Sequence, residues 1–407
     1  MLHRKRLGAW WGGVVLAAGL AVTGAPNELR AQQTLGDFEQ RGLRLGAFDL
    51  FSQLRFTGAY NDNVFAVPDG GLAGVGKQSD YFLIVQPQML LETNARRHRF
   101  YLLANGSLGR YDDFDERNFN DFTVETGGRW DASRTFSVNA FAAYDNLHTS
   151  VDDDDRRRSL QARDYDRFRG GIGLSRDWTR SFARVNSGVS RVEYQDLVDG
   201  TDNTRWNNRV RIGYRLDRQY DVFVEGRHNL TRYDNPPGAR NRDQTNWALL
   251  TGTSVDFDRV VAGEFAVGMQ YTTFEDGVTS DQLGFSFTGG LDFVLTPRTS
   301  LGFNASQAVE PSDAVGASGR NTTRLGLSLG PTLSRHVRLG ANASYNRLDF
   351  LGISRLDETY GAGVSASYNV NRYVSVSASY SHTQRMSDET FREYTQNQVF
   401  LTLQGRY

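Results

Sequence analysis

The stretch Val399–Tyr407 reads Val-Phe-Leu-Thr-Leu-Gln-Gly-Arg-Tyr and decides the fold class. In a β-strand, successive side chains point to opposite faces. The apolar face of this strand comprises Val399, Leu401, Leu403, Gly405 and Tyr407. The other face is polar, and the alternation runs to a terminal aromatic residue. This pattern is typical of the last strand of a bacterial outer-membrane β-barrel. It predicts that Leu401, Leu403 and Tyr407 form the signal for the barrel-assembly machinery.

The N-terminal region has the features of an export signal. A basic stretch, Met1–Arg6, precedes a charge-free run from Leu7 to Ala25. This arrangement predicts a signal peptide over residues 1–31, cleaved after Ala31. An uncleaved membrane anchor is the alternative, because the run approaches the roughly 20 residues that span a bilayer. We expect residues 32–48 to be a short periplasmic tail and residues 49–407 to form the barrel.

The composition agrees with a barrel in the outer membrane. Mean hydropathy is −0.51, as expected where only every second residue of a strand faces lipid. The chain has no cysteine, so it has neither a disulfide framework nor a cysteine metal site. A net charge of −1 argues against nucleic acid as a partner.

Period-2 alternation continues through most of the chain beyond Asp49. Eighteen segments show it, which predicts an all-β, antiparallel, up-and-down transmembrane barrel of about 18 strands with short periplasmic turns and longer extracellular loops. The segments lie near residues 49–60, 79–92, 97–109, 119–131, 134–147, 164–177, 180–194, 204–217, 219–232, 242–257, 259–273, 281–295, 297–309, 320–333, 335–349, 356–370, 373–384 and 394–407.

A β-propeller is the alternative fold, because its blades repeat with a similar period of about 40 residues. Two features favour the barrel. Short turns and long polar loops alternate strictly along the chain, and aromatic residues gather beside both, as Trp178 and Tyr220 do at short turns and Tyr144 and Tyr271 do near long loops. Two aromatic belts are typical of a membrane protein.

The predicted inner face is rich in arginine. The candidate lumen-lining residues are Arg167, Arg169, Arg184, Arg205, Arg209, Arg211, Arg215, Glu225 and Arg227. Arginines facing carboxylates can select anionic solutes or guide an acidic polymer. The alternative interpretation is that any water-filled barrel needs polar inward side chains.

Other candidate chemistries have less support. The run Asp152–Asp155 lacks the ligand spacing and the glycine of a calcium loop, and we predict neither a metal site nor a cofactor. His148 and Ser150 have a spacing that resembles that of outer-membrane lipid A deacylases. We identify no carboxylate to orient the histidine, and the sequence predicts that the protein is not an enzyme.

Two stretches resemble a known family. Arg55–Phe65 contains Tyr-Asn-Asp-Asn-Val-Phe, and Tyr394–Leu401 follows an Arg-Met-Ser stretch at residues 385–387. Both are similar to the opening and closing patterns of the putative β-barrel porin 2 family. The resemblance implies an integral outer-membrane protein of Gram-negative bacteria, often associated with exopolysaccharide or capsule export.

The sequence therefore predicts a porin-like channel for exopolysaccharide export or for diffusion of polar or anionic solutes. A non-conducting structural or surface-interaction barrel is the first alternative, and a lipid-modifying enzyme is the second. The expected partners are outer-membrane lipid and lipopolysaccharide, the barrel-assembly machinery and polysaccharide-export components.

Overall fold

The computed structural model describes residues 42–407, except residues 72, 73, 75, 96, 150–162, 196–201, 236–240 and 258–259. The predicted signal peptide and residues 32–41 of the predicted tail lie outside the described residues. Among the described residues no helix is long and apolar enough to cross a membrane.

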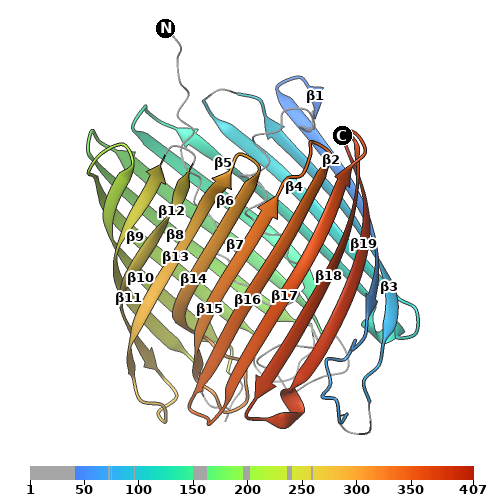
Figure 1. Cartoon of the computed structure of the whole chain (residues 1–407). Helices are drawn as coiled ribbons and strands as arrows, with labels where there is room; N and C mark the ends of the chain where they lie inside the picture. The colour runs from blue at the N-terminus through green and yellow to red at the C-terminus, as the bar shows by residue number, and fades with distance from the viewer. Residues whose placement is uncertain are drawn as a thin grey trace.

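Eighteen antiparallel strands, β2 to β19, form one closed barrel (Figure 1). Each strand pairs with the next along the chain, and β19 pairs with β2 to close the ring. The predicted fold and strand number are confirmed, and the predicted boundaries differ from the observed ones by only a few residues. The strands are β2 (Phe48–Asn61), β3 (Asp80–Thr93), β4 (Arg99–Tyr111), β5 (Phe119–Asp131), β6 (Phe136–His148), β7 (Asp164–Asp177), β8 (Ser181–Tyr194), β9 (Asn203–Arg215), β10 (Tyr220–Tyr233), β11 (Gln244–Phe257), β12 (Val261–Phe274), β13 (Gln282–Thr296), β14 (Thr299–Glu310), β15 (Gly319–Pro331), β16 (Val337–Leu351), β17 (Leu356–Asn369), β18 (Val374–Ser387) and β19 (Tyr394–Arg406).

Three short elements lie outside the barrel wall, and the sequence did not predict them. Strand β1 (Leu43–Leu45) folds back on the start of β2, with Leu43 opposite Leu50. Two single-turn 3-10 helices, η2 (Asp115–Arg117) and η3 (Thr390–Arg392), lie in the loops before β5 and β19.

The alternation of the strands separates an outer apolar face from an inner polar one. On β9 the outward residues Val210 and Ile212 lie between Trp206 and Tyr214, and Ile212 is 62% exposed. On β19, Leu401 is 60% exposed. Large exposed apolar side chains on every second position form a lipid-facing belt, and aromatic residues border it, as predicted.

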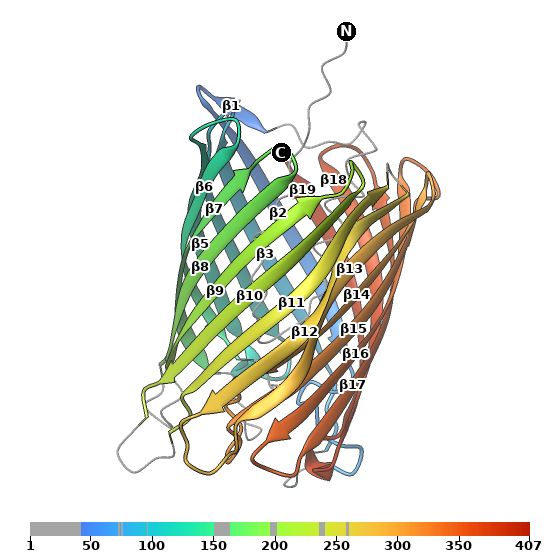
Figure 2. The same cartoon turned by 90° about the vertical axis from the view of Figure 1, so that its left-hand side faces the viewer.

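The two ends of the barrel differ. One end, here called the short-turn end, carries tight turns that Asp, Asn and Ser side chains stabilise. Asp217, for example, accepts hydrogen bonds from the backbone N–H groups of Gln219 and Tyr220 at 2.6 and 2.9 Å, which is the way such residues favour turns. The C-terminus lies at this end, and the longer connections lie at the opposite, long-loop end (Figures 1 and 2).

Candidate functional site: the inner wall and its closing seam

The most extensive charged network on the inner wall centres on Arg211 of β9. Its Nε donates to Glu225 Oε2 at 2.6 Å, and its two terminal nitrogens donate to both carboxylate oxygens of Glu264 at 2.8 and 3.0 Å. This two-pronged geometry fixes the guanidinium and gives strong hydrogen bonds. Strands β9, β10 and β12 are thereby joined across the wall.

Glu225 is the common acceptor of this network and is 0% exposed. Arg227 Nε donates to Glu225 Oε1 at 2.6 Å, and Arg209 Nε lies 3.4 Å from the same oxygen. Three arginines therefore share two carboxylates, since Glu264 is the second. The result is a nearly neutral cluster with one excess positive charge.

An apolar layer lies beneath these charges. Phe223 and Leu250 belong to a buried cluster on strands β8 to β12, and the Arg211 guanidinium lies 3.9 Å from the centre of the Phe223 ring. A cation over an aromatic face is attracted by the ring quadrupole. The arginine side chain thus covers the ring and shields it from the lumen.

A second network lies on strands β4 to β7 around the buried Asp145. Arg167 Nε and Arg169 Nε donate to Asp145 Oδ2 at 2.9 and 2.7 Å. Arg169 also reaches Glu125 Oε2 at 3.3 Å, and the Tyr101 hydroxyl donates to Glu125 Oε1 at 2.7 Å. Two arginines face two carboxylates, so this cluster is neutral.

The remaining predicted arginines lie elsewhere on the same wall. Arg184 and Arg215 both pair with Asp177 near the short-turn end. Arg205 Nε donates to Asn203 Oδ1 at 2.9 Å near the long-loop end. The structure thus divides the nine candidates among separate clusters.

Sequence reasoning missed the acidic partners. Asp145, Glu125, Asp177 and Glu264 each hold an arginine, and none was a candidate. These acids lie on the polar faces of neighbouring segments, so the sequence could have indicated that they face the lumen. The pairing itself depends on strand register, which the sequence did not define.

Small neutral polar side chains line the central part of the opposite inner wall, on β16 to β19 and β2. The hydroxyls of Thr57 and Thr402, on β2 and β19, lie 2.9 Å apart and hydrogen bond across the seam. The alternation of the strands places these side chains on the inner face: Thr57, Asn342, Ser344, Ser365, Ser367, Ser375, Ser377, Ser379, Ser381, Gln398, Thr402 and Gln404.

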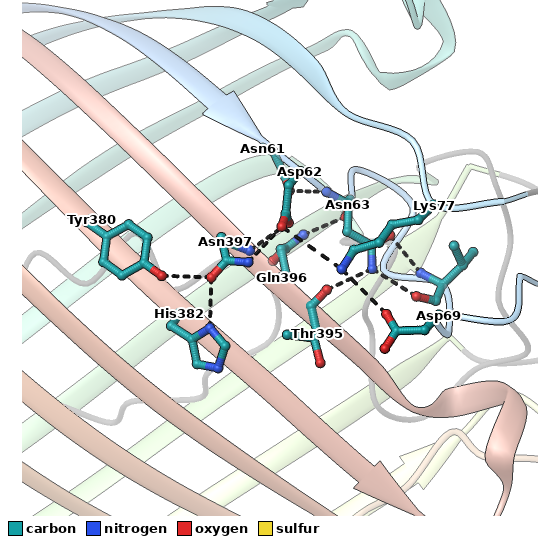
Figure 3. Close-up of polar contacts among 11 residues, drawn as sticks. Asn61, Asp62, Asn63, Asp69, Lys77, Tyr380, His382, Thr395, Gln396 and Asn397 are labelled. Carbon is teal, nitrogen blue, oxygen red and sulfur yellow. Dashed lines mark hydrogen bonds and ion pairs between the residues drawn. The ribbon is translucent and has the colours of Figure 1, made fainter.

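At the long-loop end, the seam between β2 and β19 is closed by the side chains of Asp62, Asn63, Gln396 and Asn397, here called the latch (Figure 3). The backbone N–H of Asn397 donates to Asp62 Oδ1 at 2.7 Å, and its side-chain nitrogen donates to Asp62 Oδ2 at 2.6 Å. The Gln396 side chain donates to the Asn63 carbonyl at 2.8 Å. These contacts extend the strand pairing beyond Asn61, the last residue of β2.

Asn63 is the centre of the latch and is 0% exposed. Its side-chain nitrogen donates to the carbonyls of Val67 and Thr395 at 2.8 and 3.0 Å, and its side-chain oxygen accepts from Val67 N at 3.0 Å. The Asn63 side-chain amide therefore stabilises the fold of its own loop and also binds that loop to β19. The Asn-Val-Phe part of the sequence motif has this structural basis.

The loop after Asn63 is packed as well as hydrogen bonded. Val64, Phe65 and Val67 are buried and contact Phe114 of the next long connection. The Phe65 and Phe114 rings meet edge to face, with centroids 4.9 Å apart, a favoured geometry for aromatic pairs. Lys77 bridges toward Asp69 at 3.5 Å.

The candidate enzymatic residues are only partly described. His148 is buried, and its Nδ1 lies 2.8 Å from Asp121 Oδ1, while its ring stacks on Phe119. No pattern in the sequence pointed to Asp121 as the partner of His148. Ser150 and the Asp152–Asp155 run lie outside the described residues. Within the described ranges, no group of three or more metal-ligating side chains is present.

One ion pair at the long-loop end affects a titrating group outside the strands. Arg191 hydrogen bonds to Asp234, which follows the last residue of β10. This contact lowers the pKa of the Asp234 carboxyl below its ordinary value.

A family comparison agrees with this architecture. The model of the putative beta-barrel porin 2 family matches residues 36–407. This chain belongs to that family. It is thus an outer-membrane β-barrel of the porin type, and its short-turn end is periplasmic by the general topology of such barrels. No curated protein matches the chain.

Solved structures with similar folds have little sequence in common with this porin-family barrel. The siderophore receptor PirA from Pseudomonas aeruginosa is 7% identical, with a TM-score of 0.49 over 88% of this chain and 80% of that one. OpdO from the same organism is 11% identical, with a TM-score of 0.47 over 88% and 97% of the two chains. The ferric citrate transporter FecA is 10% identical, with a TM-score of 0.46, and the match spans 84% of this chain but only 60% of that chain.

Proposed function

We propose that the barrel is a passive outer-membrane channel for polar solutes. The observation that carries the proposal is the inner wall, which combines charged networks on β4 to β12 with neutral hydroxyl and amide groups on β16 to β19 and β2. Such a wall can replace part of the hydration of a polar solute without binding it tightly. An 18-stranded barrel has the circumference of a porin.

We propose exopolysaccharide export as the specific role of this channel. Its support is the family resemblance together with the many hydroxyl groups of the inner wall, which can exchange hydrogen bonds with sugar hydroxyls. The polysaccharide-export components of the periplasm would then be its partners. We further propose that lipopolysaccharide surrounds the outer face and that the assembly machinery recognises Leu401, Leu403 and Tyr407.

The predicted selectivity role of the arginines is proposed here in a weaker form, because most of these arginines pair with carboxylates. Arg167 and Arg169 belong to a neutral cluster, and Arg211 is locked between two carboxylates. Paired charges produce a weaker field than free charges. We therefore propose that these networks stiffen the wall and act as polar lining, with a modest share in ion preference.

Planar-bilayer recording of the purified, refolded protein tests the proposed channel. We expect stable single-channel steps whose conductance rises with salt concentration, and uptake of small sugars into protein-containing liposomes. A barrel that is folded, as judged by heat-modifiable migration in gels, and that neither conducts nor passes sugars would overturn the proposal.

A non-conducting surface-interaction barrel is the second candidate. The packed, hydrogen-bonded loop after Asn63 favours it, because an ordered loop offers a defined surface at the long-loop end. Binding of the intact protein to envelope extracts, compared with a variant whose long loops are shortened, tests this role.

The lipid-modifying enzyme remains the third candidate, and the His148–Asp121 contact is its support. A general base oriented by a carboxylate is the geometry such an enzyme needs. Mass spectrometry of lipid A incubated with the protein and with His148→Ala tests it. Identical lipid A in both samples and in a protein-free control would exclude the activity.

A further inference from the structure

One part of the lipid-facing wall carries polar side chains. On β8, β9 and β10, Ser187, Asn208 and His228 lie side by side, since the strand register places Asn208 opposite both of the others. Strand alternation puts all three on the outer face, where the exposed side chains of Trp206 and Val210 flank Asn208 along β9. Polar groups within an apolar belt are costly unless they have hydrogen-bond partners. General contact with lipid therefore does not account for this cluster.

A chain of hydrogen bonds sets the state of the imidazole. Ser187 Oγ donates to Asn208 Oδ1 at 2.7 Å. The side-chain nitrogen of Asn208 lies 3.3 Å from His228 Nδ1 and can only donate to it. Nδ1 is therefore an acceptor, and the proton of the neutral ring is on Nε2. Among the residues that the structure describes, none accepts a hydrogen bond from Nε2. The cluster thus presents an unused N–H donor on the lipid-facing wall.

This donor lies at a recess in the outer wall. The imidazole of His228, which lines the recess, packs against Trp247 of β11 with ring centroids 4.0 Å apart. The recess has a volume of about 500 Å³ and an almost entirely apolar lining, to which Leu249, Met269 and Leu283 contribute. It extends from β9 to β13, and strands β9 to β12 face the viewer in Figure 2. Its shape and lining suit a hydrocarbon chain.

Gly226 opens the recess beside the imidazole. It is the outward residue next to His228 on β10, and it lines the recess. A Cβ atom placed on Gly226 would meet no other atom within 4 Å. Val224, the outward residue before it, is 51% exposed and fills the surface instead. The missing side chain at position 226 therefore leaves room for a ligand within reach of the histidine.

The depth of the cluster indicates which lipid it meets. His228 and Asn208 lie in the long-loop halves of β10 and β9. The long loops of outer-membrane barrels are extracellular, so this half of the wall faces the outer leaflet. In Gram-negative bacteria that leaflet consists of lipopolysaccharide, whose lipid A carries its acyl chains through ester and amide linkages. The carbonyl oxygen of such a linkage is an acceptor that matches the N–H of His228.

We propose that the recess binds one acyl chain of lipopolysaccharide, and that His228 Nε2 donates to the carbonyl oxygen of the ester or amide linkage of that chain. The apolar walls receive the chain, and the donor at their edge receives its one polar group. A second copy of the protein would fill the recess only by presenting an acceptor from within its own apolar belt. The site deepens the proposed contact with lipopolysaccharide and does not depend on conduction through the lumen.

The test is native mass spectrometry of the full-length refolded protein in detergent, with hexa-acyl lipid A as the probe. His228→Leu removes the donor, and Gly226→Leu fills the recess. The matched controls are His382→Leu, at a lipid-facing histidine of β18 on nearly the opposite side of the ring, and Gly58→Leu, at a lipid-facing glycine of β2 with open space above it. All of these changes put an apolar side chain on a lipid-facing wall, so heat-modifiable migration should show folded barrels.

We expect wild-type protein and both controls to bind one lipid A. His228→Leu and Gly226→Leu should bind it at least about fivefold more weakly, the factor that one lost hydrogen bond supplies. Dimyristoyl phosphatidylethanolamine should bind the wild-type protein more weakly than lipid A does, and neither change should weaken it further.

Equal binding of lipid A by all of these proteins would overturn the site. Equal losses for both lipids would overturn lipopolysaccharide as its ligand, since a groove for any acyl chain gives that result. A wild-type oligomer that binds no lipid A and that Gly226→Leu dissociates would assign the recess to a second copy and overturn the proposal. The expected pattern in a barrel that does not conduct would refute the channel and leave the site supported.

Discussion

Replacing Glu225 by Gln tests whether the Arg211 network stabilises the barrel wall. Glu225 is fully buried, accepts two hydrogen bonds of 2.6 Å and lies 3.4 Å from a third guanidinium. Removing one charge of a buried ion network costs about 3–5 kcal/mol. Glutamine keeps one acceptor oxygen, and a retained hydrogen bond is worth about 1 kcal/mol. We therefore expect the free energy of unfolding to fall by about 3 kcal/mol.

The assay is equilibrium urea unfolding of the protein refolded into lipid vesicles, followed by the fluorescence of the barrel tryptophans Trp130, Trp178, Trp206 and Trp247. Glu264→Gln is the matched control, because Glu264 contacts Arg211 but lacks the other two arginines. We expect Glu264→Gln to lower the free energy of unfolding by about half as much as Glu225→Gln, because the effects of substitutions within one ion network are not additive.

A second measurement follows from charge. The substitution at Glu225 raises the excess positive charge of the cluster from one to two, so the reversal potential should move toward that of chloride. A loss of stability below about 1 kcal/mol, in the range of exposed ion pairs, would refute the reasoning. It would mean that water reaches the network and screens it.

Three further predictions concern the latch, the lipid face and a loop ion pair. Asn63→Ala removes the amide that fastens its loop to β19, and unfolding in vesicles should become easier by about 1–3 kcal/mol; an unchanged urea midpoint contradicts this role. Leu401→Arg should cost about 2–4 kcal/mol in the same assay because it puts a charge in lipid, and the same change at inward-facing Thr402 should cost clearly less; equal costs would mean that the assigned faces are wrong. The lowered pKa of Asp234 means that its contact with Arg191 is complete above the ordinary pKa of aspartate and is lost only as pH falls through the lowered value, so carboxyl NMR assigned with Asp234→Asn should show a midpoint below about 3.9.

The barrel itself was predictable from the sequence because two local signals agree along the whole chain. Period-2 alternation indicates strands, and turn residues such as Asp217 end them, so neither signal depends on distant contacts. The prediction missed β1, because Leu43–Leu45 is too short to show a period.

The site was predictable only in part. Alternation placed Arg211 on the inner face, but its partner Glu264 lies 53 residues away, and no local pattern pairs the two. The same limit applies to Asn63, whose motif was recognised while its contact with Thr395, 332 residues away, was not. Which charges pair inside a barrel depends on how neighbouring strands are aligned, and the sequence pattern does not define that alignment.

The latch also has a consequence for how the ring forms. Every neighbouring strand pair except β19 with β2 is adjacent in the sequence, so the low-contact-order pairings can form first. The Asp62–Asn397 contact spans 335 positions, which makes closure of the seam the natural slow step. A circular permutant that joins β19 to β2 by a short turn and opens the chain between β17 and β18 would make the latch a local hairpin contact. In that permutant the slow step should move to the pairing of β17 with β18, the new end strands. No asparagine side chain hydrogen bonds across that pair, as Asn63 does across the seam, in the part of the chain that the structure describes.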